Sequence, residues 1–458
     1  MQQPLLPDVK RVHFVGIGGS GMSPLAEILH ALGYTITGSD INESDNVTRM
    51  RNLGITVKMP QMADNVGDAE LVVYTAAVRD DNPELIAAKQ RNFPLLERAT
   101  LLGVLSRQFA NTVAVAGTHG KTTTSSMLSH ILLEAGKDPS VFIGGRLPLI
   151  NANGKAGQSD IFVCEACEFK DHYLQMTPAI SIILNVDADH LDYFGDLKGV
   201  IASFRRFAAQ TTETLIVNAD DPETLQAVDG LTNAHIVRYG ADKNNDWSAQ
   251  NITTVHGSYG KYDLYHQGVF VAAVTLGVPG RHNVFNSLAA TAAAYLCGVA
   301  TEDIVRGLEA FHGAGRRFEF VGVVNDVTIV DDYAHHPTEI AATIAAAKAL
   351  TEGDVWAVFQ PFTFSRTARH LNEFADTLSA ADHVIVSDIM GSRETNEWNV
   401  SSVQITEQID HAHYLATFEE ITRFVATNVQ PHDLVLTMGG GDVYKCARMI
   451  KAALEQRR

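Results

Sequence analysis

The sequence predicts an α/β fold of three domains, because of its length, its alternating strand and helix patterns, and its glycine-rich or polar turns after strands. At 458 residues the chain exceeds what one hydrophobic core supports, and about 150 residues per domain gives three domains. Strand patterns that alternate with helical patterns are typical of parallel sheets. We expect a Rossmann-like domain at 1–107, a central P-loop-type domain with a parallel sheet at 108–312, and a second Rossmann-like domain at 313–458.

The composition is that of a soluble globular enzyme, with 46% hydrophobic and 19% charged residues. A net charge of −18 argues against nucleic-acid binding, because phosphate backbones require a basic surface. Met1 to Lys10 has no export-signal pattern, and no apolar run reaches the roughly 18 residues that cross a bilayer. Four cysteines form no disulfide framework, so we expect a cytoplasmic protein without membrane insertion.

The most specific motif is a glycine turn between a strand pattern at Val113–Ala116 and an apolar helical pattern. Such a turn directs backbone N–H groups and the positive end of a helix toward one point, where a triphosphate can bind. Lys121 would contact the outer phosphates, and the Thr122 hydroxyl would reach Mg²⁺. Val115 stands where the strict P-loop has glycine, and the alternative is a plain turn between a strand and a helix. The candidate nucleotide-binding residues are Gly117, Thr118, His119, Gly120, Lys121, Thr122 and Thr123.

A second glycine turn follows the first predicted strand and contains Gly16, Gly18, Gly19 and Gly21. Asp40 closes the next strand, where an acidic residue can accept a hydrogen bond from a ribose hydroxyl. Taken alone, this arrangement favours an NAD-dependent dehydrogenase. The same kind of turn holds any diphosphate at a helix N-terminus, so a different nucleotide is equally compatible with it.

Two buried strand patterns after the central loop end in polar residues. The first ends in Glu165 and Glu168, and the second is followed by Asn185 and His190. Strand ends of a doubly wound sheet lie along the edge where ligands bind, and carboxylate and imidazole groups there suit magnesium. The alternative for each residue is a polar loop side chain satisfied by its neighbours.

Three further patterns are less specific. Asn283 and Asn286 share one face of an alanine-rich helix and could pair with an adenine edge, although asparagine is also common near helix starts. Gly439–Gly441 is either a tight turn after a strand or a second phosphate-binding segment. Cys164 and Cys167 lack the second pair that a zinc site requires, and we interpret them as packing residues.

Together the motifs resemble those of the Mur ligase family, the ATP-dependent amide-bond formers of peptidoglycan synthesis. They match in order and approximate spacing from about residue 11 to about residue 450. The matching segments are Gly117–Thr124, Glu165–Glu168, Asn185–Asp192, Gly280–Asn286, Gly315–Glu319 and Asp331–Pro337.

The resemblance implies that ATP phosphorylates the lactyl carboxylate of UDP-N-acetylmuramate and that L-alanine attacks the acyl phosphate. It implies two Mg²⁺ ions and a cytoplasmic enzyme that is a monomer or a homodimer. The first domain would hold the UDP-sugar, the second ATP and the third the amino acid. A close alternative within the family is a recycling ligase that attaches an intact tripeptide to the same sugar.

By motif match, the resemblance also implies residue roles. The catalytic residues would be Lys121, Glu165, His190, Arg317 and His335. Magnesium would be held by Thr122, Glu165 and His190. Besides the central loop, ATP would contact Asn283, Asn286, Arg317 and Asp332. The UDP-sugar would contact Gly18, Gly19, Ser20, Gly21 and Asp40. The amino acid would contact His335 and Arg366.

The chain departs from the family pattern at two places. Phe362-Thr363 stands where relatives often carry His-Arg, so one expected cation near the amino acid is missing. Later members of the family use a carbamoylated lysine to hold magnesium, but the corresponding position here is Arg205, and we expect no such modification.

Overall fold

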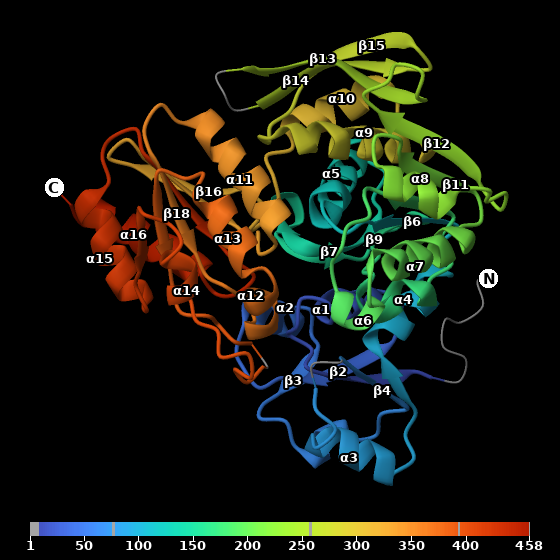
Figure 1. Ribbon diagram of the computed structural model, residues 1–458. Helices are drawn as coiled ribbons and strands as arrows, with labels where there is room; N and C mark the ends of the chain where they lie inside the picture. Colours follow the sequence, from blue (N-terminus) through green and yellow to red (C-terminus); the bar gives the residue numbers. More distant parts are fainter. Residues whose placement is uncertain (1–8, 76–77, 256–258, 393, 458) are drawn as a thin grey trace. The chain divides into compact units, whose positions relative to one another are not determined.

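The computed structural model describes residues 9–75, 78–255, 259–392 and 394–457. The expectation about an export signal in Met1–Lys10 therefore falls almost wholly outside the described residues. Over the described ranges, the strands form three sheets (Figure 1). None of the helices within these ranges combines the length and apolarity needed to cross a membrane. The chain divides into two compact units, Met1–Gln250 with Asp263–Val274 and Phe285–Phe311, and Asn251–Tyr262 with Thr275–Val284 and His312–Arg458.

The first sheet is parallel throughout and has the order β3-β2-β1-β4-β5. Its neighbours β2 and β4 lie on opposite sides of β1, so the connections after β1 and β4 run in opposite directions and leave a crevice at the carboxyl edge. Buried apolar side chains cover both faces of the sheet. The elements are β1 (Arg11–Val15), α1 (Ser23–Ala31), β2 (Thr35–Ser39), α2 (Asp45–Asn52), β3 (Thr56–Lys58), η1 (Ala63–Val66), β4 (Leu71–Tyr74), α3 (Pro83–Gln90), β5 (Leu95–Glu97) and α4 (Arg98–Ser106).

The central sheet has the order β15-β14-β13-β12-β11-β10-β6-β9-β7-β8 over the described residues. β6 lies between β10 and β9 and is parallel to both, and its residues from Val113 to Ala116 are fully buried. The elements are β6 (Asn111–Ala116), α5 (Lys121–Glu134), β7 (Ser140–Leu147), η2 (Pro148–Ile150), β8 (Ala152–Lys155), β9 (Ile161–Glu165), η3 (Phe169–Gln175), β10 (Ile180–Ile183), α6 (Leu191–Phe194), α7 (Leu197–Ala209), β11 (Thr214–Asn218), α8 (Pro222–Val228), β12 (His235–Gly240), β13 (Trp247–Val255), β14 (Tyr259–His266), β15 (Val269–Thr275), α9 (Arg281–Leu296) and α10 (Thr301–Ala310).

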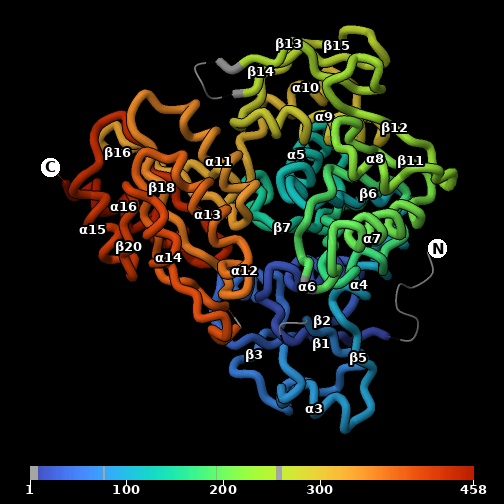
Figure 2. The backbone as a smooth tube through the Cα atoms, in the orientation of Figure 1, coloured from blue at the N-terminus to red at the C-terminus, as the bar shows by residue number. Residues whose placement is uncertain are grey.

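The third sheet has the order β16-β17-β21-β18-β19-β20, with β16 antiparallel and the others parallel. Helices α11 and α13 lie on one side of this sheet and α15 and α16 on the other (Figure 2). One apolar core packs the first pair of helices against the sheet, and a second core packs the other pair. The elements are β16 (Glu319–Val324), β17 (Val327–Asp332), α11 (Pro337–Leu350), β18 (Val355–Phe359), α12 (Phe364–Arg369), α13 (Leu371–Leu378), β19 (His383–Val386), α14 (Val403–Thr406), β20 (Ala412–Tyr414), α15 (Phe418–Asn428), β21 (Leu434–Met438) and α16 (Tyr444–Gln456).

The α/β fold with parallel-rich sheets is confirmed, but the third sheet has more strands than the sequence predicted. Four strand patterns, which begin at Val327, Val355, His383 and Leu434, predict four strands there, and the described residues add β16 and β20. β20 is only three residues long, and β16 has a register shift at Gly322, so neither gives a clear strand pattern. The domain boundaries at 107 and 312 stay a prediction.

Helix α4 packs closely on η3 through Gly103. A Cβ atom at Gly103 would lie 2.1 Å from the Gln175 carbonyl oxygen and 2.7 Å from its carbonyl carbon. Gln175 O also accepts a hydrogen bond from Arg107, so this backbone cannot easily retreat.

We expect Gly103→Ala to lower the free energy of unfolding by about 2 kcal/mol or more, because overpacking against backbone forces the helix outward. Urea unfolding measures the change. Gln90→Ala, at an exposed helical position, is the control and should alter stability by less than about 0.5 kcal/mol. Equal stability of Gly103→Ala and the parent protein would contradict the close packing.

Candidate active site

The predicted strand–loop–helix motif is present as β6, a turn at 117–120, and α5. Gly120 precedes the helix in a left-handed conformation (φ 86°), and Gly117 also has a positive φ of 145°. Asn185, which follows β10, holds the turn through two hydrogen bonds to the backbone of His119. Its Oδ1 accepts from His119 N (2.8 Å), and its Nδ2 donates to His119 O (3.1 Å). The turn is therefore fixed by its neighbouring strand as well as by its own glycines.

Lys121 lies against the turn and forms a mostly buried ion pair. Its Nζ lies 2.9 Å from Glu168 Oε2 and donates a hydrogen bond to Thr118 O (3.0 Å). Glu168 is 3% exposed. Burial opposes the charge of Lys121, but Glu168, Cys167 and Glu165 together raise its pKa above the usual value. Lys121 thus keeps its positive charge beside the turn.

Glu165, at the end of β9, accepts hydrogen bonds from hydroxyl and amide donors of two segments, α5 and β7. Its Oε2 accepts a hydrogen bond from Thr122 Oγ1 (3.2 Å), and its Oε1 accepts from Ser125 Oγ (3.1 Å) and Gly144 N (2.5 Å). A carboxylate next to a hydroxyl offers the hard oxygen ligands that Mg²⁺ prefers. Thr122 and Glu165 therefore fit the predicted magnesium site.

His190 lies after β10 in a left-handed conformation (φ 53°). Its ring packs on the Phe169 ring with 4.9 Å between centroids, and its backbone N–H donates to Asp189 Oδ1 (2.7 Å). The neighbouring Asp187 accepts from the His119 side chain when that ring donates (3.2 Å). The end of β10 thus places the Asp187 carboxylate beside the His119 ring of the turn and the His190 ring against Phe169.

The two asparagines of α9 take different roles. A Cβ atom at Gly120 would lie 2.8 Å from Asn286 Oδ1, so Asn286 covers the turn directly. Asn283 Nδ2 donates to Pro279 O (2.6 Å), which ties the start of the helix to the preceding segment. Both side chains are buried.

The two cysteines of the Cys-x-x-Cys motif are free thiols. Burial, followed by the nearby carboxylate of Glu168, raises the pKa of Cys167 to about 11. Burial likewise raises the pKa of Cys164. Thiolates are therefore disfavoured there, which agrees with a packing role.

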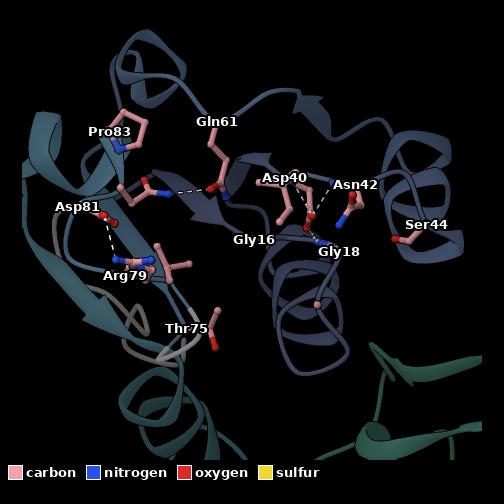
Figure 3. Close-up of a pocket in the computed structure, with 14 residues that line it drawn as sticks. Gly16, Gly18, Asp40, Asn42, Ser44, Gln61, Thr75, Arg79, Asp81 and Pro83 are labelled. Carbon is pink, nitrogen blue, oxygen red and sulfur yellow. Dashed lines mark hydrogen bonds and ion pairs between the residues drawn. The ribbon is translucent and has the colours of Figure 1, made fainter. Parts of the chain in front are cut away.

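A pocket of about 650 Å³ lies at the carboxyl edge of the first sheet (Figure 3). Gly18, Gly19 and Asp40 line it on one side, and residues of the β4–α3 connection line it on the other. Asp40 Oδ2 accepts a hydrogen bond from Gly18 N (2.8 Å), and Oδ1 accepts from the backbone of Ile41 (2.8 Å). Asp40 therefore holds the glycine turn in place.

Ser20 and Gly21, also predicted to contact the UDP-sugar, lie close to other segments of the chain. Ser20 O accepts a hydrogen bond from Asn153, and a Cβ at Gly21 would lie 3.0 Å from Arg98 Cδ. Both contacts attach the turn to other parts of the chain. Ser20 and Gly21 are not among the residues that line the pocket.

In the third domain, Arg316 and Arg317 behave differently. Arg316 contacts Asp331 (3.1 Å) and donates to the carbonyl oxygens of Gly439 and Gly441 (2.7 Å each). Arg317 has its guanidinium over the Tyr333 ring, 5.1 Å from the centroid. Arg316, which also lies over the Tyr333 ring at 4.9 Å, therefore secures the triglycine turn. The assignment of Arg317 to the ATP site stays a prediction.

Asp332 lies at the end of β17 and is almost fully buried. Its carboxylate accepts hydrogen bonds from Phe318 N and Ala334 N, each at 2.7 Å. Burial raises the pKa of Asp332 to about 6, although Arg317 and these N–H groups act in the opposite direction.

His335 and Arg366 are the residues predicted to hold the amino acid. His335 Nδ1 lies 3.3 Å from Glu339 Oε2 and 3.0 Å from Tyr333 O, so its ring orientation is fixed. Arg366 lies on α12, whose first turn is anchored where Ser365 N donates to Glu394 Oε2 (2.8 Å). Both residues follow strands of one sheet, β17 and β18.

Four residues that shape the central site have no individual role predicted from the sequence. Glu168 was noted as a strand-end carboxylate but given no role, and its spacing after Glu165 was the available signal. Asn185 was likewise only part of a motif. Ser125, one helical turn after Lys121, and Gly144, from a neighbouring strand, carried no signal of their own.

A parallel sheet with a lysine-bearing glycine turn at its carboxyl edge, flanked by carboxylates, defines a nucleotide-dependent enzyme. Three family models match the chain: "Mur ligase family, catalytic domain" at residues 11–110, "Mur ligase middle domain" at 115–294, and "Mur ligase, glutamate ligase domain" at 316–441. The chain belongs to the Mur ligase family of ATP-dependent ligases.

Its relatives cover nearly the whole chain. It is 44% identical over 446 residues to a UDP-N-acetylmuramate–L-alanine ligase of Caldanaerobacter subterraneus, with 96% of this chain and 97% of the relative covered. It is 46% identical to the ligase of the same name from Agathobacter rectalis, with 94% and 95% covered. The crystal structure of UDP-N-acetylmuramate–alanine ligase from Thermotoga maritima is similar with a TM-score of 0.82 at 29% identity, over 98% of this chain and 100% of that one.

We expect Gly144→Ala to raise the Mg²⁺ concentration needed for half-maximal activity by about threefold to tenfold. The added Cβ would lie 2.8 Å from Glu165 Oε2 and 3.0 Å from Thr122 Oγ1, so both oxygens must shift, and misplaced ligands weaken a metal site. A Mg²⁺ titration of ADP release measures the effect. Leu149→Ala, at an exposed position soon after the same strand, is the control, and an identical titration curve for Gly144→Ala and this control would contradict the assignment.

A second prediction concerns Asp332 and pH. Its pKa is raised from 3.8 to about 6 on folding, so the folded state binds the proton more tightly than the unfolded state. The resulting stabilisation is full below about pH 4 and is lost as the pH rises through about 6. A shift of this size corresponds to at most about 3 kcal/mol.

Asp332→Asn cannot titrate, so the parent protein should lose stability relative to this variant between about pH 4 and pH 7. Urea unfolding at several pH values tests this, with the exposed Asp376→Asn as control. A stability difference that stays constant over this range would contradict the prediction.

Proposed function

We propose that this chain joins L-alanine to the lactyl carboxylate of UDP-N-acetylmuramate, with ATP as the energy source, in the synthesis of peptidoglycan precursors in the cytoplasm. The observation that carries the proposal is its full-length similarity to ligases named for this reaction, at 40–46% identity. The lysine-bearing turn, with Thr122 and Glu165 beside it, supports the ATP-dependent step.

The chemistry explains why a triphosphate is required. A carboxylate does not acylate an amine at neutral pH, because the oxygen would have to leave as hydroxide. Transfer of the γ-phosphate to that carboxylate makes an acyl phosphate, in which phosphate is the leaving group. The alanine amine then attacks the acyl carbon, and the amide forms as phosphate departs.

Positive charge is needed where two anions approach each other. Lys121 would contact the outer phosphates, and Arg317 would add a second cation. Thr122 and Glu165 would hold one Mg²⁺, and His190 a second. The bound ions would neutralise phosphate charge as Lewis acids. Within this chain, Glu168 and the turn carbonyls keep Lys121 charged and close to the turn.

The remaining binding roles are assigned to residues at the edges of the sheets. The pocket lined by Gly18, Gly19 and Asp40 would hold the UDP part of the sugar nucleotide, and Ser20 and Gly21 of the same turn would contact it as well. The amides of Asn283 and Asn286 would contact adenine, and Asp332 would lie near ATP. His335 and Arg366 would hold the amino acid, with Arg366 suited to its carboxylate by bidentate geometry.

A second candidate is a ligase that attaches a tripeptide to the same sugar. A murein peptide ligase from Psychrobacter arcticus has a similar structure, with a TM-score of 0.73 at 27% identity over 97% of this chain. Phe362 and Thr363 supply no cation for the amino acid, which leaves its size and charge open. An NAD-dependent dehydrogenase has less support, because the glycine turn at 16–21 is its single feature.

An amino-acid panel separates these candidates. With UDP-N-acetylmuramate and ATP present, we expect ADP release to depend on L-alanine, with glycine and L-serine weaker and the tripeptide inactive. Maximal turnover with the tripeptide would favour the recycling reaction instead. NADH that binds tightly in a fluorescence titration, without ADP release under any condition, would favour the dehydrogenase.

Lys121→Ala should lower the rate of ADP formation by about a thousandfold or more, because the charge on the transferred phosphoryl group loses its fixed cation. Lys198→Ala, at an exposed position of α7 in the same domain, should keep full activity. Circular dichroism checks that both variants fold. Near-parental turnover of a folded Lys121→Ala protein would rule out the assigned phosphate contact.

A further inference from the structure

A buried polar network centred on Glu84 lies next to the pocket of the first domain. This residue lies in the first turn of α3, and its side chain is fully buried, as is that of His13 on β1. No motif in the sequence marks either residue, and neither lines the pocket. A fully buried carboxylate requires compensating donors, so its partners show what it holds together.

Four donors from three segments converge on this carboxylate: β1, β2 and the segment of η1 with its N-cap. Oε2 accepts hydrogen bonds from Ser39 Oγ (2.6 Å) and, when its ring donates, from His13 Nε2 (3.2 Å). Oε1 accepts from Asn65 Nδ2 (2.7 Å) and Met62 N (3.2 Å). A carboxylate is an acceptor only, which is what four converging donors require. The partners lower the pKa of Glu84 even though burial, the largest influence, raises it.

Two of the four donors are adjacent in sequence to residues that line the pocket. Ser39 precedes Asp40, which holds the glycine turn, and Met62 follows Gln61, which lines the opposite wall (Figure 3). Asn82, two residues before Glu84, caps α3 through its Oδ1 and donates from Nδ2 to Gln61 Oε1 (2.7 Å). Glu84 therefore fastens the strand that carries Asp40 to the segment that carries Gln61.

We propose that Glu84 is a positioning residue for the sugar nucleotide: it sets the separation of the two pocket walls without touching the ligand. This inference rests on the proposed function, since it takes the pocket as the site of UDP-N-acetylmuramate. Its consequence is specific, because loss of the carboxylate weakens binding of the sugar nucleotide and leaves the chemistry at the central sheet unchanged.

The matched variants are Glu84→Ala, Glu84→Gln and Asn65→Ala. Glu84→Ala removes both attachments, and Asn65→Ala removes the one on the Gln61 side with less risk to folding. Glu84→Gln can keep its oxygen toward Met62 and Asn65 if its NH₂ group faces Ser39 and His13, because a hydroxyl and a neutral imidazole can both accept. This conservative variant should therefore restore binding.

Steady-state kinetics with purified full-length protein provide the test. We expect KM for UDP-N-acetylmuramate to rise about tenfold or more in Glu84→Ala and about threefold or more in Asn65→Ala, with KM for ATP and kcat within about twofold of the parent. Glu84→Gln should stay within about threefold of the parent. Calorimetric titration with UDP-N-acetylmuramate checks that the KM changes reflect binding.

Glu70→Ala is the control for stability alone. Glu70 accepts hydrogen bonds from Lys10 N and Arg11 N in the same sheet and lies outside the pocket lining. If Glu84→Ala and Asn65→Ala lower only the melting temperature and the active fraction, with KM for the sugar nucleotide unchanged, the inference is wrong. It is equally wrong if Glu70→Ala raises this KM as much. A parent protein that releases no ADP in response to UDP-N-acetylmuramate would instead reject the proposed function.

Discussion

The register of three parallel strands is the constraint on which the central site depends. In β6, Val115 pairs with Glu165 of β9, and Ala116 pairs with Ile183 of β10, so the chain leaves all three strands at nearly the same level. The glycine turn, the Glu165 carboxylate and the Asn185 amide consequently meet at one edge. A slip of one residue would turn Glu165 to the opposite face of the sheet and remove it from Thr122. Strand pairing therefore determines which residues meet at the site, and the loops only complete it.

Each of the three domains contains a buried carboxylate that is held by several donors or by an ion-pair partner. Glu168 has the Lys121 ammonium, and Glu84 has four donors, one of them an imidazole. Asp332 has two backbone N–H groups and the more distant Arg317, and there burial dominates and raises its pKa. Burial raises the pKa of both Glu84 and Asp332, and the donors together outweigh it only at Glu84.

The sequence was sufficient for the α/β fold, the strand–turn–helix at 111–134 and the polar strand ends, because each depends on local patterns. It could not show that Glu168 pairs with Lys121 or that Gly144 faces Glu165, since these contacts join segments through strand order. It also missed the short strands β5 and β20, where three residues are too few for a period to emerge. Ser20 and Gly21 belong to the correct turn, but only coordinates show that they contact Asn153 and Arg98.

The glycine turn at 16–21 shows why a nucleotide fingerprint does not identify its nucleotide. A Cβ at Gly18 would lie 2.7 Å from Val47 Cγ2 and 2.9 Å from Asp40 Oδ2, so glycine is required there by the packing of α2 alone. The Asp40 carboxylate is likewise engaged by backbone N–H groups of its own domain. Packing therefore requires Gly18, and hydrogen bonds within the domain engage Asp40, whether or not a ligand is bound. The fingerprint says nothing about the opposite wall of the pocket, where Gln61 and Arg79 derive from connections that no motif marks.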